Sequence, residues 1–257
     1  MLSICFVWFV SSIAAQELET FERADSVYEG LRSLPWSEKE LDAIAEVLPG
    51  KFYKFTDASE ERFKSEAPKH RIIHLATHAI IDDKAPLYSK LIFAKNPKGR
   101  EDGLLHTYEL YNMRLNADLA VLSACNTGSG MLVRGEGVIS LARGFLYAGC
   151  PSIVMSLWSI DDKSTSLLMR NFYEGLSQGL TKDEALRESK LKMINSGDPV
   201  MSNPYYWAGF VTIGDTRPIR IENPGRPDWW IYILAGIIIV LAGLATRFRK
   251  KFLKLSR

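Results

Sequence analysis

The sequence predicts an α/β fold, with a mostly parallel sheet and helices on both of its faces, followed by a C-terminal transmembrane helix. Short, continuously apolar runs alternate with segments of helical pattern, as in parallel sheets built from strand–helix–strand units. Near the C-terminus, residues 229–246 form an 18-residue run without a formal charge, long enough to cross a bilayer.

Two segments precede the main domain. Residues 1–15 are apolar from Leu2 onward and end in the small residues Ala14 and Ala15, which predicts a signal peptide. No Lys or Arg precedes the apolar run, so a short uncleaved anchor or the truncated start of a longer chain is the alternative. Residues 16–33 are polar with scattered apolar residues and are predicted to form a helical lead-in.

The main domain is expected over residues 34–215. Ser37 and Glu40 form a capping-box pattern that predicts the start of its first helix. A breaker, Pro68, precedes the apolar run that ends at His78. The elements expected in this half are helix 37–48, strand 51–55, helix 58–67, strand 71–78, strand 91–94 within a hairpin or arm over 89–105, and a short helix over 108–113.

The second half of the domain continues the alternation of strands and helices. Thr181 and Glu184 form another capping-box pattern. The expected elements are strand 119–125, helix 135–148, strand 152–158, helices 162–178 and 182–195, and strand 207–213. Residues 216–228 contain three prolines and are predicted to be a linker.

Charge and cysteine content exclude several classes of function. The 257 residues carry a net charge of +2, but residues 247–257 hold six basic and no acidic side chains, which leaves 26 basic against 30 acidic residues elsewhere. A mildly acidic body argues against nucleic acid as a partner. The three cysteines, Cys5, Cys125 and Cys150, are too widely spaced for a metal cluster or a disulfide framework. No Gly-rich nucleotide-binding motif opens a helix, so no cofactor is expected. A metal site would need His74 and His78 with carboxylates, and the sequence suggests no third ligand, so no metal is expected.

The apolar run at residues 229–246 is predicted to anchor the chain in a membrane. Trp229, Trp230 and Tyr232 lie where an aromatic belt is expected, and the basic tail, residues 247–257, follows the other end. By the positive-inside rule the tail lies in the cytoplasm, and the main domain is therefore expected on the extracytoplasmic side.

Two predicted strands deliver reactive side chains to one edge of the sheet. One run ends at His78 and the other at Cys125, and ligands of open α/β sheets bind outside the carboxyl ends of the strands. A thiol beside an imidazole is the minimum apparatus for nucleophilic acyl transfer. His74 is expected either to pack beneath the site with its hydrogen bonds satisfied or to orient His78. His106 and Cys150 are expected to be structural.

Five motifs follow one another along the domain: HLATH at residues 74–78, LSACNTG at 122–128, GEGV at 135–138, SLW at 156–158 with Asp161 and Asp162, and NPYYWA at 203–208. Together they resemble the CHAT domain, a caspase-like cysteine peptidase domain related to separases and gingipains. The resemblance covers residues 34–215 and implies a caspase-like fold with His78 and Cys125 as the catalytic dyad. Two features depart from the family pattern: Ala79 follows the histidine where Gly is usual, and fewer than 35 residues precede the domain where helical repeats are usual.

The resemblance also implies roles for groups around the dyad. The backbone N–H groups of Cys125 and Ala79 would form the oxyanion hole. Asp161 and Asp162 follow a strand end, where separase-like relatives carry an acidic residue in the pocket for a basic P1 side chain. The alternative role for these two carboxylates is to cap the helix that follows. Glu136 is a further candidate for the pocket.

The sequence therefore predicts a membrane-anchored cysteine endopeptidase of the CHAT type that cleaves a protein or peptide substrate, with a basic residue at P1. A catalytically silent scaffold that binds a partner protein at the membrane is the alternative. An amidase or acyltransferase that uses the same dyad on small molecules is a third hypothesis. A regulatory or repeat-containing partner protein is expected to replace the upstream repeats.

Overall fold

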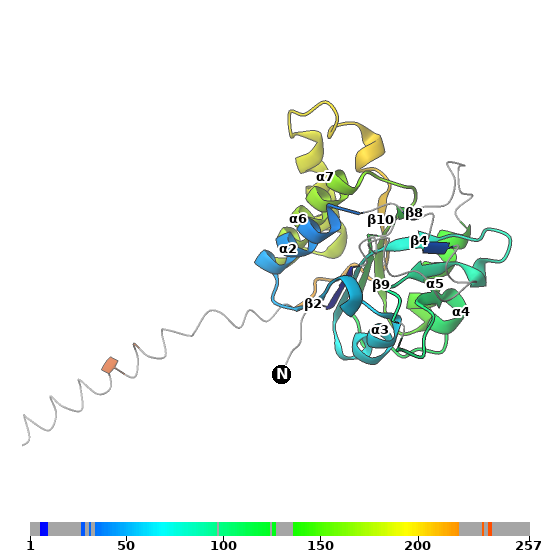
Figure 1. Ribbon diagram of the computed structural model, residues 1–257. Coiled ribbons are helices and arrows are strands. Elements are labelled where there is room, and N and C mark those ends of the chain that lie inside the picture. Colours follow the sequence, from blue (N-terminus) through cyan, green and yellow to red (C-terminus); the bar gives the residue numbers. More distant parts are fainter. Residues whose placement is uncertain are drawn as a thin grey trace, which may run out of the picture. The chain divides into compact units, whose positions relative to one another are not determined.

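The computed structural model describes residues 6–9, 27–28, 31, 34–96, 98–123, 125–126, 136–220, 233 and 236–237. The chain divides into two units, Met1–Ile221 and Glu222–Arg257. Everything that follows concerns the first unit, shown as a ribbon in Figure 1.

The described part of this unit contains a six-stranded sheet with the strand order β10-β9-β7-β3-β1-β2. Neighbouring strands are parallel, except that β10 runs antiparallel to β9. The strands are β1 Phe6–Phe9, β2 Lys51–Tyr53, β3 Ile72–Ala76, β7 Leu119–Leu122, β9 Ser152–Ser156 and β10 Phe210–Gly214. The prediction of a mostly parallel sheet is confirmed.

A second sheet of four short strands, in the order β6-β5-β4-β8, carries the two residues of the predicted dyad. Its strands are β4 His78–Ile80, β5 Lys90–Ile92, β6 Leu104–His106 and β8 Cys125–Asn126. The antiparallel pairing of β5 with β6 confirms the predicted arm over residues 89–105. The predicted strands 71–78 and 119–125 are each divided between the two sheets, so His78 begins a new strand instead of ending one.

Helices cover both faces of the larger sheet, as predicted. The α-helices are α2 Ser37–Val47, α3 Glu60–Glu66, α4 Thr107–Leu110, α5 Glu136–Tyr147, α6 Asp162–Ser177 and α7 Lys182–Ile194. Four 3-10 turns complete the described elements: η1 Phe55–Asp57, η2 Ala67–Lys69, η3 Pro86–Tyr88 and η4 Pro204–Tyr206. Figure 1 shows α2, α6 and α7 together on one side of the strands and α3, α4 and α5 on the other.

The alternation of side chains along β3 divides the interior into two cores. Ile72 and Ala76 pack with residues of α2, α6 and α7. Ile73 and Leu75 point the other way and pack with residues of α3 and α5. Because both faces are buried, every residue of β3, β7 and β9 is buried, which explains why these strands are mostly apolar in the sequence.

One predicted capping box forms and the other does not. Thr181 accepts from the backbone N–H of Glu184, whose carboxylate reaches back to the Thr181 N–H. At α2 the N-cap is Trp36 and makes no side-chain capping bond, so the predicted capping box is wrong, whereas the predicted start of the helix at Ser37 is confirmed. The physical reason is that the Glu40 carboxylate is drawn inward, 3.0 Å from the ring of His74, and is 1% exposed.

The ends of the chain carry three predictions that the described residues touch only in part. Strand β1, Phe6–Phe9, lies within the predicted signal segment and pairs with β2 and β3, and cleavage after residue 15 would remove it. The predicted transmembrane run 229–246 lies outside the described residues except at positions 233, 236 and 237. Within the described part of the chain, no helix has the length and apolar character needed to span a bilayer. The basic tail lies outside the described residues.

Candidate active site

The backbones of His78 and Cys125 lie side by side in the smaller sheet. His78 in β4 pairs in parallel register with Cys125 in β8, and Ala79 pairs with Asn126. Adjacent strands are about 4.8 Å apart. For Cys125 and Asn126 the structure describes the backbone alone. The structure thus brings together the two segments that the sequence predicts to share one site.

The register of β4 with β8 follows from that of β3 with β7, because both segments of the chain pass from the larger sheet into the smaller one at the same level. Strands β3 and β7 pair from Ile72 with Leu119 to Leu75 with Leu122. Beyond this ladder the N–H of Ser123 still donates to the carbonyl of Leu75, at 3.0 Å. The chain then enters the smaller sheet as β4 and β8, which keep the parallel pairing. Because both crossings occur at the same level, residues far apart in the sequence arrive as neighbours.

The arm formed by β5 and β6 holds β4 from the other side. The buried hydroxyl of Thr77, the residue between β3 and β4, donates to the carbonyl of Ile92. His78 pairs with the same Ile92 in the antiparallel ladder. The ring of His78 is 1% exposed. A general acid or base must come within hydrogen-bond distance of the substrate, so catalysis requires a state in which His78 is more exposed.

Ala79, at the position where the resemblance suggested Gly, is not strained. Among the described residues other than glycine, Phe55 is the one with a positive φ, so Ala79 pays no left-handed penalty. However, Ala79 pairs with Leu91 on one side and with Asn126 on the other. Its N–H therefore points at a paired strand, and in this arrangement the geometry does not support Ala79 as a free oxyanion donor.

His74 makes two buried polar contacts on one face of the larger sheet. Its Nδ1 lies 3.0 Å from the hydroxyl of Tyr173 in α6, and its Nε2 lies 3.0 Å from Oε1 of Glu40 in α2. All three side chains are at most 1% exposed. Nδ1 is therefore hydrogen-bonded, whereas Nε2 and the Glu40 oxygen lie at ion-pair distance without hydrogen-bond geometry. The packed role of His74 stays a prediction.

The two aspartates proposed for a substrate pocket both make structural bonds. Asp161 caps α6, and its Oδ2 accepts from the N–H and the hydroxyl of Ser164, each at 3.0 Å. Asp162 accepts from the N–H of Trp36 at 3.0 Å. Burial raises the pKa of Asp162 to about 6 against the opposing effect of that bond. Glu136 is the first residue of α5, and its side chain is outside the described part.

An aromatic surface lies beside Asp161 that the sequence analysis did not assign to the site. Trp158, 38% exposed, donates from its indole N–H to the carbonyl of Tyr205 at 2.9 Å. Tyr205, 54% exposed, donates from its hydroxyl to the carbonyl of Ser159 at 2.8 Å. The signal was present in the sequence, because these rings belong to the SLW and NPYYWA motifs.

Cys150 is a buried thiol with no sign of reactivity. Burial raises its pKa to about 11, and its thiol donates to the carbonyl of Ser152 at 3.2 Å. Thiolates and not thiols are nucleophiles, so Cys150 is inert at neutral pH. This agrees with the structural role expected for it.

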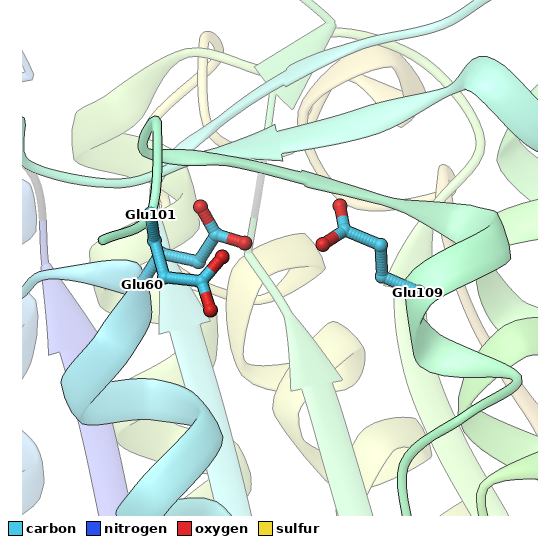
Figure 2. A group of neighbouring side chains, drawn as sticks. All are labelled: Glu60, Glu101 and Glu109. Carbon is cyan, nitrogen blue, oxygen red and sulfur yellow. The ribbon is translucent and has the colours of Figure 1, made fainter.

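A cluster of three carboxylates, Glu60, Glu101 and Glu109, is the one group among the described residues with the spacing of a metal site (Figure 2). The ammonium of Lys64 lies 2.7 Å from an oxygen of each of the three. Lys64 therefore occupies the position that a metal ion would take. Burial raises the pKa of Glu60 to about 7, although Lys64 opposes this shift.

The cluster connects α3 to the arm. Glu60 and Lys64 lie one turn apart in α3, Glu109 lies in α4, and Glu101 precedes β6. Within this cluster, only Glu60 and Lys64 could have been paired from the sequence, because their i,i+4 spacing is that of an ion pair on a helix. Burial alone would lower the pKa of Lys64, but its hydrogen bonds to the three carboxylates raise it overall.

Comparison with known proteins adds a family to this geometry. The sequence model described as the CHAT domain matches residues 12–215. The chain belongs to the CHAT domain family. The match begins well before residue 34, where the sequence analysis placed the start of the domain.

Two curated relatives of this CHAT domain are much longer proteins. Tetratricopeptide repeat protein 28 of Mus musculus is 25% identical over 227 residues, and that of Homo sapiens is 27% identical over 222 residues. Each alignment covers 74% of this chain but only 9% of the relative. The chain therefore matches a small part of these repeat proteins.

Solved structures that are similar to the CHAT domain include a gingipain and a separase. The Arg-specific cysteine proteinase gingipain R gives a TM-score of 0.48 at 10% identity, covering 85% of this chain and 47% of that one. Separase in the Saccharomyces cerevisiae separase–securin complex gives 0.44 at 15% identity, covering 82% and 12%.

Proposed function

We propose that this CHAT domain is a cysteine endopeptidase in which Cys125 is the nucleophile and His78 the general acid and base. The observation that carries the proposal is the parallel register of His78 with Cys125. Two Cα atoms about 5 Å apart on adjacent strands allow an imidazole and a thiol to share one carbonyl. Membership of the CHAT family supports the same pair.

The chemistry follows that of other cysteine nucleophiles. The Cys125 thiolate attacks the peptide carbonyl carbon, and His78 gives a proton to the amine as the C–N bond breaks. A thioester to Cys125 remains. His78 then takes a proton from water, which attacks the thioester and releases the acid. The N–H of Cys125 is the proposed oxyanion donor, and Ala79 joins it only if β4 separates from its paired strands.

A silent protein-binding scaffold is the second candidate function, and the burial of His78 favours it. A substrate cannot approach an imidazole that is 1% exposed. The peptidase therefore needs a conformational step that the scaffold does not need. Nothing in the Cys–His pairing distinguishes the two, so labelling of the thiol must decide.

The test is labelling of the full chain with a peptidyl acyloxymethyl ketone, followed by mass spectrometry of the modified cysteine. We expect modification of Cys125 and not of Cys150, whose pKa is about 11. Cys125→Ala should abolish labelling and peptide cleavage, and His78→Ala should slow both by at least about 100-fold. Cys150→Ala is the matched control and should change neither. Absent labelling, or equal labelling of Cys125 and Cys150, would refute the peptidase and retain the scaffold as the proposed function.

We also propose that Asp161 selects a basic residue at P1. It follows β9, which is adjacent to β7, the strand that leads toward Cys125. It is exposed and retains an oxygen, Oδ1, beyond the one that caps α6. The exposed ring of Trp158 offers a neighbouring face for an Arg or Lys side chain.

This selectivity is tested with peptidyl acyloxymethyl ketones that differ only in the P1 residue, which is Arg, Lys or citrulline. Asp161→Asn keeps the cap but should remove the preference for Arg over citrulline. Asp162→Asn, at the carboxylate bound to Trp36, is the control and should retain the preference. Equal labelling by Arg and citrulline probes in the unmodified chain would contradict the pocket. Glu136 remains a proposal of the same kind.

The membrane anchor and the repeat partner also stay proposals. We propose that residues 229–246 span a membrane, with the domain outside and the basic tail in the cytoplasm. The apolar character of this run and the basic residues that follow it support the proposal. Protease protection of tail and domain in sealed vesicles tests this orientation. The curated relatives are tetratricopeptide repeat proteins, which supports a repeat-containing partner.

A further inference from the structure

Three rings at the surface of the arm form what we call the aromatic cluster: Tyr88, His106 and Tyr108. His106 stacks on Tyr108 with the ring centroids 5.0 Å apart, and Tyr88 meets these two rings edge-on at 6.3 and 5.8 Å. Tyr88 is 59% and Tyr108 43% exposed. Leu87, beside Tyr88, is 48% exposed. Exposed tyrosines that already hold one another in place are typical of protein-binding surfaces.

Negative charge surrounds the aromatic cluster. Glu109 accepts from the backbone N–H of His106 at 2.8 Å and lies 3.3 Å from its ring. Burial and the carboxylates of Glu109 and Asp102 raise the pKa of the Tyr108 hydroxyl. Asp102 and Glu109 are the carboxylates with the largest effect on Tyr108, and Glu101 shares the ammonium of Lys64 with Glu109.

The cluster is close to the predicted dyad along the smaller sheet. His106 in β6 pairs with Lys90 in β5, and Lys90 pairs with Ile80 in β4, two residues beyond His78. Two residues along a strand and two strands across place the backbone of His106 roughly 12 Å from that of His78. An extended peptide spans that distance in about four residues.

We propose that the aromatic cluster is a docking site for a basic, extended segment of the protein on which this domain acts. Arg or Lys side chains of that segment lie over the rings of Tyr88 and Tyr108, where a cation is attracted to the face of an aromatic ring. The surrounding carboxylates attract the same charges and disfavour acidic segments. Arg is preferred to Lys because its planar guanidinium also stacks on the ring. Docking does not require catalysis, so it holds for a peptidase and for a scaffold.

The test measures binding in the full chain carrying Cys125→Ala, in detergent micelles, so that no turnover consumes the probe. The probe is a fluorescein-labelled peptide of alternating Arg and Ser, compared with the same peptide containing citrulline in place of Arg. Fluorescence anisotropy should show the Arg peptide binding at least about tenfold more tightly, with the difference shrinking at high salt. Equal binding of the two peptides would overturn the proposal.

Substitutions locate the binding site. Tyr88→Ala and Tyr108→Ala should each weaken binding of the Arg peptide about two- to fivefold. Tyr147→Ala is the matched control, because Tyr147 is 70% exposed and packs on Tyr111 outside the cluster, and it should have no effect. An equal loss from Tyr147→Ala would refute the assignment.

Hydrogen exchange provides a reading that does not depend on the tyrosine variants. Bound Arg peptide should protect the amides of residues 87–88 and 104–110, and protection confined to other segments would refute the site. The result is separable from the proposed chemistry. Failure of Cys125 to react with an acyloxymethyl ketone would remove the peptidase and leave peptide binding unchanged.

Discussion

Glu60 offers a test of the electrostatics of the carboxylate cluster by pH. Its side chain is 1% exposed, and its Oε2 accepts from the N–H of Gly103 at 2.9 Å. Lys64, 2.7 Å from the other oxygen, is shared with Glu101 and Glu109. One ammonium among three carboxylates cannot compensate all of them, so the most buried carboxylate holds its proton most tightly. The perturbation is Glu60→Gln, whose amide oxygen can still accept from Gly103.

The magnitude follows from the pKa of Glu60, which burial raises from 4.5 to about 7. Between these two values the folded state binds the proton more tightly than the unfolded state. The free energy of unfolding therefore falls as the pH rises from 4.5 to 7 and levels off above pH 7. At about 1.4 kcal/mol for each tenfold change in proton affinity, the loss reaches at most about 3 kcal/mol.

Urea unfolding at pH 5, 6, 7 and 8, followed by tryptophan fluorescence, measures this loss. Other groups titrate in the same range, so the quantity to compare is the stability of the unmodified chain minus that of Glu60→Gln. We expect this difference to fall by about 2–3 kcal/mol from pH 5 to pH 8. The same comparison for Glu61→Gln, at an exposed neighbour in α3, should be flat. A flat difference for Glu60→Gln as well would show that the cluster does not hold a proton.

Two further substitutions test the packing around the sheet. His74→Ala should lower the free energy of unfolding in urea by about 3–5 kcal/mol, and His74→Ala with Glu40→Leu by less, because no buried carboxylate is then left alone. Equal losses would contradict the pairing. Gly149→Ala should lower the melting temperature more than Gly179→Ala, where only the positive φ of +85° is unfavourable. At Gly149, with φ at +104°, a Cβ would also lie 2.8 Å from the carbonyl of Leu115.

The larger sheet was predictable because burial on two faces leaves a strong trace in the sequence. Strands β3, β7 and β9 are mostly apolar, and the structure places each within a few residues of its predicted bounds. Thr181 and Glu184 correctly predicted the start of α7, because both bonds of the capping box join residues only three positions apart. Local signals of this kind need no knowledge of the rest of the fold.

The smaller sheet was not predictable as a separate sheet. Its strands contain two or three residues each, too few to show a period. The juxtaposition of His78 and Cys125 was nevertheless expected, because it requires only that two parallel strands be neighbours. The capping prediction at Ser37 failed for a non-local reason, since Glu40 binds His74, a residue on another element. The carboxylate cluster escaped notice because Glu101 comes from the arm and Glu109 from α4, both far from Glu60 in the sequence.

Because His78 is buried, the rate at which Cys125 is labelled distinguishes a peptidase from a scaffold. If the state that exposes His78 costs about 3 kcal/mol, fewer than about 1% of molecules occupy it, and labelling of Cys125 slows by the same factor of roughly 150. A partner that binds only this state would then accelerate labelling by up to that factor. We therefore expect the labelling rate to saturate with partner concentration in a peptidase. In a scaffold, no partner makes labelling of Cys125 faster than labelling of Cys150. Equal labelling of the two cysteines at a saturating concentration of partner would refute a peptidase that its partner activates.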